Sequence, residues 1–247
     1  MRSRWRAGPA SITLVRHAES IGNVADAAAH GRDAETLDLE LRDADVPLSD
    51  TGREQADALR QWLEGGLESS GGPPPDAVIS SPYVRAAETA RIAFAGLGLA
   101  VDHDERLRER DLGLFDGLTG RGIRTRFPDE AARRSRVGKF YYQPPSGESW
   151  VDVVLRVRSL LRDLEHLDGA HVWLVTHQAV IMAHRFVLEG LDEQTVLAMS
   201  REEPLPNASV STYDRRGELM ELRTFADTSA VDQADAEVTH EPEQAHG

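Results

Sequence analysis

The chain has 247 residues, 40% of them hydrophobic, which is enough to bury a substantial core in one α/β domain. It contains no cysteine, so disulfides, thiolate metal sites and a cysteine nucleophile are excluded. The net charge of −14 argues against general nucleic-acid binding, and no stretch has the length and apolar character of a membrane span. Nothing near the N-terminus has the apolar core of a signal peptide, so we expect a cytoplasmic protein that does not bind membranes.

The apolar pattern of the chain alternates between strands and helices. Short β-branched runs alternate with longer stretches whose apolar residues recur at helical spacing. In the N-terminal half the predicted elements are a strand at 11–15, a helix that follows 48–52 and ends near 64, a strand at 77–80, an alanine-rich helix to about 95 and a strand at 100–102. Ser81 and Pro82 are predicted to be the N-cap and the first residue of the alanine-rich helix.

The C-terminal half continues this alternation. A helix is predicted from about 150 to 167, the apolar run 171–176 has the length and β-branching of a central strand, and a helix from about 178 to 189 follows it. Segments 208–214 and 218–225 predict a hairpin at the sheet edge. Alternating units of this kind predict a three-layer α/β/α sandwich with a mostly parallel central sheet.

The composition of the chain predicts one folded domain with a flexible segment at each end. We expect a single domain over 11–225, with a cap insertion at about 114–147, and a flexible N-terminus at 1–10. Residues 226–247 contain six acidic residues, no lysine or arginine and almost no large apolar residue, so they are predicted to be a disordered tail. Inside the insertion, residues 121–139 carry seven basic side chains against two acidic ones. This basic segment is either a cap that steers anionic substrates or a solvated helix face.

Residues suited to phosphate chemistry follow three of the predicted strands. Arg16 and His17 end the first strand. Arg85 lies in the opening turn after the second strand, and His177 follows the long apolar strand. These positions converge at the carboxyl ends of a parallel sheet, where arginine can match phosphate oxygens bidentately. The joint pattern predicts an anion pocket with a candidate nucleophile, although either histidine alone is more commonly a surface or capping residue.

Five motifs in register carry a resemblance to a known family. They are 14–20 (LVRHAES) with Asn23, 48–56 (LSDTGREQA), 80–90 (SSPYVRAAETA), 107–113 (LRERDLG) and 175–177 (VTH). In order and spacing, from about residue 11 to 225, they resemble the histidine phosphatase superfamily, also called phosphoglycerate mutase-like. The resemblance implies a phosphohistidine mechanism on a small phosphorylated substrate. We expect no cofactor, and no metal-ligand spacing supports a metal site.

The resemblance implies a role for each matching residue at the phosphate. His17 would attack the substrate phosphorus as nucleophile. Arg16, Arg85 and His177 would hold the phosphoryl oxygens as negative charge develops. Asn23 would add a further phosphate contact. Neighbouring arginines disfavour the protonated imidazole, so the nucleophile keeps the lone pair that it needs.

Glu109 would be the general acid and base of the same mechanism. It would protonate the leaving alkoxide and later activate a water molecule. A free glutamic acid is mostly ionised at neutral pH and must carry a proton to act as an acid. We therefore predict an activity optimum below neutrality.

Two positions depart from the pattern usual in the family. Ala18 replaces the glycine after the first histidine, which is a small change. Gln178 replaces the glycine after the second histidine, a position that supplies a backbone N–H to phosphate in relatives. Gln178 can still supply this N–H, and its side chain either narrows the pocket or adds a hydrogen bond to the substrate.

The motifs favour a phosphatase over a mutase. The mutases carry a Glu-Arg-His-Tyr-Gly type sequence around the acid and an aromatic stretch after the first motif, whereas this chain has ERDLG at 109–113 and no aromatic residue at 24–47. Segments 138–142 and 145–149 resemble the broad-range acid phosphatases of the family. Two alternatives stay open, namely a phosphoglycerate mutase-type phosphotransferase and a non-catalytic phospholigand-binding regulatory module.

Overall fold

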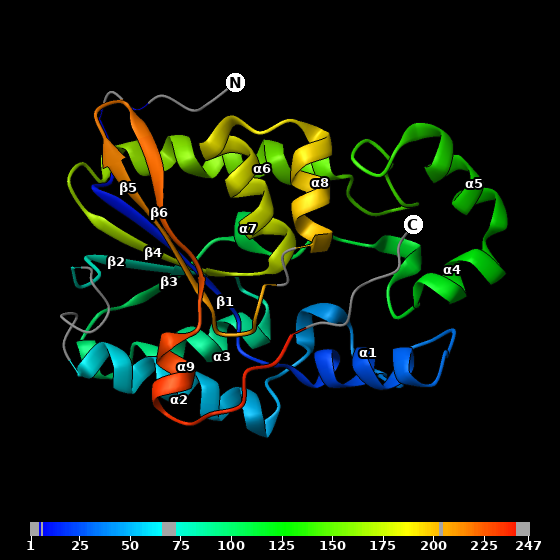
Figure 1. The fold of residues 1–247 in the computed structure, drawn as a ribbon, viewed down its shortest axis with the longest axis horizontal. Coiled ribbons are helices and arrows are strands. Elements are labelled where there is room, and N and C mark those ends of the chain that lie inside the picture. Colours follow the sequence, from blue (N-terminus) through cyan, green and yellow to red (C-terminus); the bar gives the residue numbers. More distant parts are fainter. Residues whose placement is uncertain (1–4, 6, 66–72, 203–204, 241–247) are drawn as a thin grey trace.

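A six-stranded sheet forms the middle of the molecule in the computed structural model, which describes residues 5, 7–65, 73–202 and 205–240 (Figure 1). In sheet order the strands are β3 (Val101–His103), β2 (Ala77–Ser80), β4 (His171–Thr176), β1 (Ser11–Arg16), β5 (Val210–Arg216) and β6 (Leu219–Asp227). From β3 to β1 the strands are parallel, while β5 runs antiparallel to β1 and forms a hairpin with β6. The predicted α/β fold with a mostly parallel sheet is confirmed.

Helices cover both faces of the sheet. One face carries α6 (Trp150–Asp163), α7 (Gln178–Arg185) and α8 (Glu193–Glu202), and the other carries α2 (Asp50–Glu64), α3 (Val84–Ala93) and α9 (Ser229–Gln233) (Figure 1). Successive residues of a strand point to opposite faces, so Leu14 packs in the core beneath α6 and α7, whereas Val15 packs in the core beneath α2 and α3. The sequence predicted this three-layer arrangement correctly.

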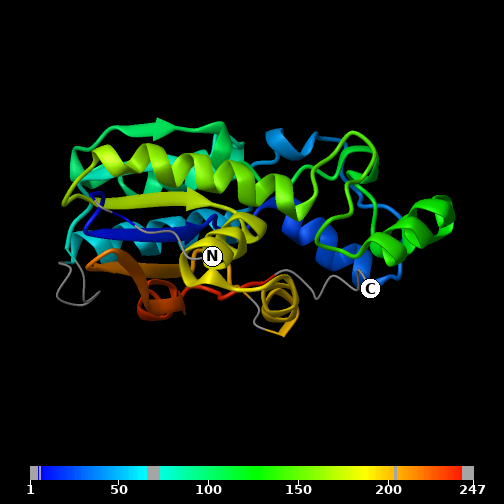
Figure 2. The same cartoon turned by 90° about the horizontal axis from the view of Figure 1, so that it is seen from above.

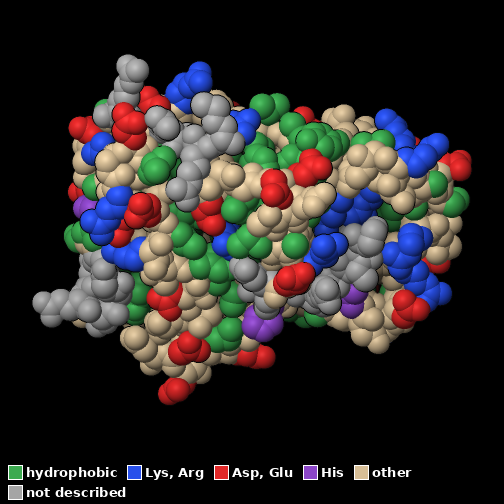
Figure 3. All heavy atoms as spheres, turned by 45° about the horizontal axis from the view of Figure 1, so that its top comes forward, with side chains coloured by type: hydrophobic (Ala, Val, Ile, Leu, Met, Phe, Trp, Pro, Cys, Tyr) green, Lys and Arg blue, Asp and Glu red, His purple; other side chains and the backbone are tan. Residues whose placement is uncertain are grey.

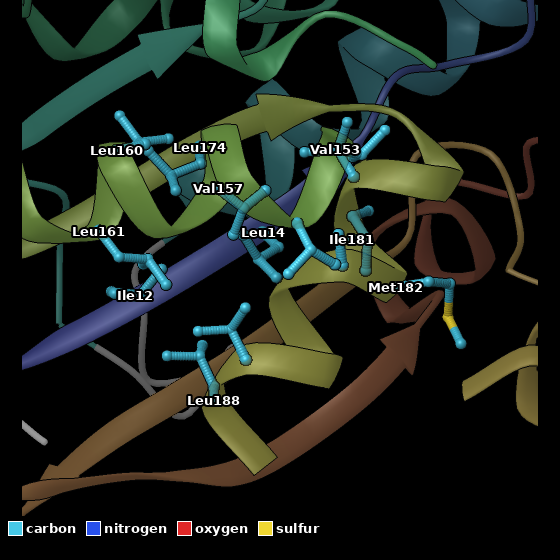
Figure 4. Close-up of a cluster of buried hydrophobic side chains, with 14 of the residues drawn as sticks. Ile12, Leu14, Val153, Val157, Leu160, Leu161, Leu174, Ile181, Met182 and Leu188 are labelled. Carbon is cyan, nitrogen blue, oxygen red and sulfur yellow. The ribbon is translucent and has the colours of Figure 1, made fainter. Parts of the chain in front are cut away.

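The core beneath α6 fixes the position of β1. Figure 4 shows Ile12 and Leu14 of β1 facing Val157 of α6, and all three side chains are fully buried. Complete burial of one such side chain contributes about 1.5–3 kcal/mol. The resulting register places Arg16 opposite Thr176, so the residues that follow β1 and β4 emerge at the same edge of the sheet.

The predicted insertion at 114–147 forms a separate lobe, which we call the cap, beyond the carboxyl ends of the strands (Figures 1 and 2). It contains α4 (Gly120–Arg126) and α5 (Pro128–Val137). A small hydrophobic cluster of Phe115, Ile123 and Tyr142 holds it together. The cap thus has little apolar core of its own, and it is joined to the sheet domain by Phe140, which is buried in the core beneath α6 and packs against Phe186, and by polar contacts.

Two helices of the sheet domain lack the broad buried apolar face that predicts a helix such as α2 or α6. In α1 (Ile21–Gly31) only Asn23 and Ala29 are buried, and in α8 only Val196 is buried. Neither helix therefore shows the apolar spacing that predicts an amphipathic helix. The start of α1 is set by a capping box between Ser20 and Asn23.

The predicted start of α3 is wrong. The helix begins at Val84, after the cap residue Tyr83, and not at Pro82. Ser81 N donates to Val175 O at 2.9 Å, so strand pairing continues through Ser81 and delays the helix. The Ser81 hydroxyl accepts a hydrogen bond from Tyr83 N at 3.2 Å, which is a turn and not a helix cap.

The two chain ends are more ordered than their composition suggests. Trp5 is only 2% exposed and its N–H donates to Glu218 O at 2.8 Å, so the expectation of a flexible N-terminus does not hold there. Disorder of the tail does not hold for 226–240, because Ala230 and Val231 of α9 are buried in the core beneath α2. Two small apolar residues dock this helix while its acidic residues face solvent. The expectations for 1–4, 6 and 241–247 lie outside the described residues.

Candidate active site

The predicted residues from three strands meet at the carboxyl edge of the sheet. Arg16 is the last residue of β1, His17 follows it, and His177 follows the neighbouring strand β4. His17 N donates to Thr176 O at 2.8 Å, and the ring centroids of His17 and His177 lie 5.0 Å apart. Arg85, in the first turn of α3, lines the same cavity as His17.

The His17 imidazole is held as a neutral base. Its Nδ1 lies 2.8 Å from Ala18 O, which can only accept, so Nδ1 carries the proton and Nε2 keeps its lone pair. Burial lowers the pKa of His17 well below 6.5, and the positive charges of Arg85 and Arg16 lower it further. His17 therefore presents a desolvated, unprotonated ring nitrogen in a positive field.

His177 is fully buried beside His17. Its Nε2 lies 2.9 Å from Ser81 Oγ, whereas its Nδ1 has no hydrogen-bond partner in the part of the chain that the structure describes. Burial lowers the pKa of His177 well below 6.5, as does the charge of Arg85. Because buried polar atoms are nearly always hydrogen-bonded, the Nδ1 atom marks a place where a ligand could bind.

Both arginines are buried and anchored by main-chain oxygens. Arg16 is 0% exposed and donates to Leu205 O. Arg85 Nη1 donates to Asp43 O at 2.6 Å and lies 2.9 Å from the Asp43 carboxylate. Its guanidinium carbon lies 5.3 Å from the centroid of the Tyr83 ring. Two guanidinium groups held at one edge form a preorganised site for an anion.

Glu109 lies on the segment that follows β3. Its Oε1 accepts a hydrogen bond from Arg110 N at 2.7 Å, and its Oε2 lies 3.4 Å from Ala179 N. Arg156 of α6 donates to Glu109 O at 3.2 Å and pairs with Glu148 at 3.0 Å. These contacts hold the main chain around Glu109 and leave its side chain lining the cavity.

Asn23 and Gln178 reach the cavity from the starts of two helices. Asn23 is the third residue of α1, and its Oδ1 accepts a hydrogen bond from Ser20 N at 2.9 Å. Gln178 is the first residue of α7 and is half-buried. Both side chains line the cavity, so Gln178 is positioned where its side chain can limit or contact a bound molecule.

A cavity of about 900 Å³ opens at this edge of the sheet. The predicted residues that line it are His17, Asn23, Arg85, Glu109 and Gln178. The other two, Arg16 and His177, are fully buried next to the lining residues. The volume far exceeds a phosphate group, so space remains for the molecule that carries the phosphate.

Basic side chains line another part of the same cavity. They are Arg110, Lys139 and Arg201, which with Arg134 of α5 we call the basic cluster. Burial, together with the charges of the other three, lowers the pKa of Lys139 to about 8. Burial also lowers the pKa of Arg110 to about 10. Figure 3 shows Lys and Arg side chains gathered where the cap meets the rest of the molecule.

The basic segment 121–139 divides into two parts. Its outward part forms surface ion pairs, Arg121 with Asp33, Arg126 with Glu35 and Arg133 with Glu130. Its inward part contributes Arg134 and Lys139 to the basic cluster. The outward part is a solvated helix face, and steering of anionic substrates by the inward part stays a prediction.

Three residues around the site have no signal in the sequence. Asp43 pairs with Arg85, the Ser81 hydroxyl bonds His177, and Asn207 Nδ2 donates to His17 O at 3.2 Å. Asp43 begins a short 3₁₀ helix and Asn207 lies in a turn, both far along the chain from their partners. Their roles follow from tertiary contact, which neither periodicity nor local motifs report.

The described residues offer neither a metal site nor a membrane span. No group of three or more His, Cys, Asp or Glu side chains among them is placed to hold a metal ion. No helix among them is both long enough and apolar enough to cross a bilayer.

Comparison with known proteins identifies similar sequences over nearly the whole domain. Residues 12–228 match the histidine phosphatase superfamily (branch 1). The 6-phosphofructo-2-kinase/fructose-2,6-bisphosphatase of Caenorhabditis elegans is 35% identical over 177 residues, which are 70% of this chain and 33% of that protein. The bovine form 1 of that enzyme is 29% identical and aligns with 96% of this chain and 45% of its own length. The chain thus spans between a third and a half of these curated relatives.

Solved structures with the same fold match at full length. A protein described as mycobacterial hydrolase 1 is 28% identical, with a TM-score of 0.70, 90% of this chain covered and 99% of that chain. Mycobacterial glucosyl-3-phosphoglycerate phosphatase, solved with inorganic phosphate, is 27% identical with a TM-score of 0.68 and the same coverage. These similarities agree in fold and family with the motifs and the site geometry.

Proposed function

The chain belongs to the histidine phosphatase superfamily, and on that premise we propose that it hydrolyses phosphomonoesters of small metabolites through a phosphohistidine on His17. The observation that carries the proposal is the His17 imidazole, which is buried, neutral and fixed with its lone pair on Nε2. The solved phosphatase of similar structure supports hydrolysis. The likeness to broad-range acid phosphatases stays a prediction.

The first step transfers the phosphoryl group to the enzyme. His17 Nε2 attacks phosphorus, so that an N–P bond forms while the P–O bond to the leaving alkoxide breaks. Arg16 and Arg85 bind the non-bridging oxygens, on which negative charge is concentrated. The unpartnered Nδ1 of His177 and the side chain of Asn23 supply further contacts to these oxygens.

The second step returns the enzyme to its starting state. Protonated Glu109 gives its proton to the leaving alkoxide in the first step and is left as a carboxylate. This carboxylate then takes a proton from water, whose oxygen attacks phosphorus and breaks the N–P bond. Inorganic phosphate leaves, and Glu109 is again protonated.

The basic cluster indicates the class of substrate. Lys139 is half-buried near three other cations, so binding of an anion there would offset the mutual repulsion. We propose that the preferred substrate carries a second phosphate or carboxylate group in addition to the phosphate that is transferred. The side chain of Gln178 would limit the size of the group between the two anions.

Trapping of the intermediate tests this function. The chain is mixed with a ³²P-labelled phosphomonoester and quenched, and we expect label on His17 that is stable to alkali and labile to acid, as phosphohistidine is. His17→Ala should not incorporate label. His166→Ala removes an exposed histidine at the far end of α6 and serves as the matched control.

The same experiment separates the alternatives. Release of inorganic phosphate indicates a hydrolase, whereas transfer of label to a second phosphoglycerate indicates a mutase. Binding of phosphate without label on His17 indicates a non-catalytic module, and this result would overturn the proposal. A panel that includes phosphoglycerates and bisphosphorylated sugars would also define the leaving group.

The cellular location of the protein and the kinds of molecule that it binds stay predictions. We propose a cytoplasmic location and a small phosphorylated substrate, with no nucleic-acid partner, from the composition of the chain. Cell fractionation with an antibody against the chain tests the location. The oligomeric state does not enter the proposed chemistry, since every group in it comes from one chain.

A further inference from the structure

Residues 236–240, which we call the strap, are docked on the body of the protein. Ala236 and Val238 are half-buried and pack against the hydrophobic cluster that includes α2 and α3. Ala236 N donates to Val231 O of α9 at 3.1 Å. The strap is therefore held by apolar contacts even though it belongs to the most acidic part of the chain.

Asn207 and Gln55, two residues with buried amide side chains, bind the strap. The main-chain N–H of Asn207 donates to Thr239 O at 2.8 Å, and Thr239 Oγ1 donates to the side-chain Oδ1 of Asn207 at 3.2 Å. Gln55 of α2 donates through Nε2 to Glu237 O at 2.7 Å and to Thr239 Oγ1 at 2.9 Å. The Thr239 hydroxyl thus accepts from one amide and donates to the other.

The same two amides bind the loop that carries the nucleophile. Asn207 Nδ2 donates to His17 O at 3.2 Å and lies 3.4 Å from Asn23 Oδ1. Gln55 Oε1 accepts a hydrogen bond from Glu19 N at 2.8 Å. Asn207 and Gln55 are both 0% exposed, so neither can replace a lost protein partner with bulk water.

We propose that the strap is a positioning element for His17, acting through Thr239, Asn207 and Gln55. With the Thr239 hydroxyl bound, the oxygen and nitrogen of each amide are held in one orientation. In that orientation Asn207 presents its side-chain N–H to His17 O, and Gln55 presents its Oε1 to Glu19 N. Loss of the hydroxyl removes its bond to Asn207 Oδ1 and one of the two strap bonds of Gln55 Nε2, so both buried amides are less firmly oriented, while Gln55 keeps its bond to Glu237 O.

The expected signature is a loss of turnover without a loss of phosphate binding. The His17 ring is oriented by its bond to Ala18 O, so a shift of this loop changes the direction of Nε2. Misplacement by about 1 Å can lower a rate by up to about 100-fold. Arg85 is fixed by Asp43 and Tyr83, outside this network, and should continue to bind phosphate.

The test uses point variants of the full chain. Thr239→Val keeps the shape and removes both hydroxyl bonds, and we expect kcat to fall about 5- to 10-fold. KM and the Kd for inorganic phosphate, measured by calorimetry, should change less than about twofold. Thr239→Ser should restore kcat. Thr228→Val is the matched control, because it removes an exposed bond to Asp232 in the same region of the chain.

Val238→Asp provides a second variant, which releases the strap by placing a charge in its apolar contact while the Thr239 hydroxyl is kept, and we expect the same fall in kcat. Hydrogen exchange gives a readout that does not depend on activity. The Glu19 amide should exchange faster in Thr239→Val and Val238→Asp than in wild type or Thr228→Val. Circular dichroism and thermal melting confirm that each variant is folded.

The proposal rests on the proposed role of His17, and the two can fail separately. Failure of the function appears as a wild-type chain without phosphohistidine, while exchange at Glu19 still reports on the strap. Unchanged exchange at Glu19 in both strap variants overturns the proposal. A kcat equal to that of Thr228→Val, or an effect on KM alone, overturns it as well.

Discussion

Two positively charged parts of the site are held by different contacts. We call Arg16 and His17 the floor of the cavity, and the basic cluster around Lys139 its wall near the cap. Arg16 and His17 end β1, which is buried on both faces and paired with strands on both sides. Lys139 belongs to a lobe with a hydrophobic cluster of three buried residues, tied to its neighbours by Phe140 in the main core and by surface ion pairs worth about 0–1 kcal/mol. The charges proposed to act on the reacting phosphorus thus lie on a central strand, whereas those proposed to select the rest of the substrate lie on a lobe with a small core of its own.

The largest effect should follow from loss of a charge in the floor. Arg16→Met removes a guanidinium from the reacting phosphate, and we expect kcat/KM to fall about 10²- to 10³-fold for every phosphomonoester. The measurement is initial-rate kinetics on an aryl phosphate and on a bisphosphorylated sugar. If only the bisphosphorylated substrate were affected, the division between floor and wall would be wrong.

A smaller effect is expected at the support of Glu109. Glu148→Gln removes the charge that pairs with Arg156 and so loosens the segment that carries Glu109. We expect kcat to fall about 10-fold with little change in KM, because the acid is displaced while the phosphate contacts remain. Asp163→Asn, at the last residue of α6, breaks an exposed pair with Arg106 and is the control. Equal losses in the two variants would contradict a specific role for Glu148.

The wall should affect only substrates that carry a second anion. Lys139→Met should raise KM about 10-fold for a bisphosphorylated substrate, because a charge-assisted contact is worth about 1.5–3 kcal/mol. KM for an aryl phosphate should change less than about twofold. Arg124→Met, at an exposed position of α4, is the matched control. An equal effect on both substrates would show that Lys139 acts on the reaction and not on selection.

Buried histidines at the floor and behind it make the free energy of unfolding depend on pH. Burial lowers the folded-state pKa values of His17, His177 and His184 below 6.5, so the unfolded chain binds more protons in acid. Stability should therefore fall as pH drops below about 6.5, by up to about 1.4 kcal/mol per pH unit for each histidine. Urea unfolding between pH 7.5 and 5 measures this slope. His184→Leu should reduce the slope, and an unchanged slope would contradict this assignment.

Activity and stability should respond to acid in opposite ways. The lowered pKa of His17 keeps the nucleophile neutral in mild acid, where Glu109 is more often protonated. We therefore expect kcat/KM to rise below neutrality until the protein loses stability. A flat or alkaline profile would count against Glu109 as the acid.

The parts of the fold that were predicted correctly are those with strong local periodicity. β1, β2 and β4 are short apolar runs, and α2 and α6 repeat apolar residues at helical spacing, so burial of each element can be read from its own residues. The apolar pattern fails for α1 and α9, where capping by Ser20 or the docking of two small residues replaces an apolar face. The acidic composition of 226–240 also led to a wrong prediction of disorder, because net charge does not indicate which side chains of a segment face the core.

The sequence by itself determined the order of the strands and helices and the family, because alternation and motif spacing are local properties of the chain. It also placed Arg16-His17, Arg85 and His177 at one edge, since parallel strands end together. Only the tertiary structure decided that Asp43 pairs with Arg85, that Lys139 faces the cavity and that the strap reaches the loop of His17. These contacts join residues far apart in the chain, and they depend on how the elements pack and not on any one element.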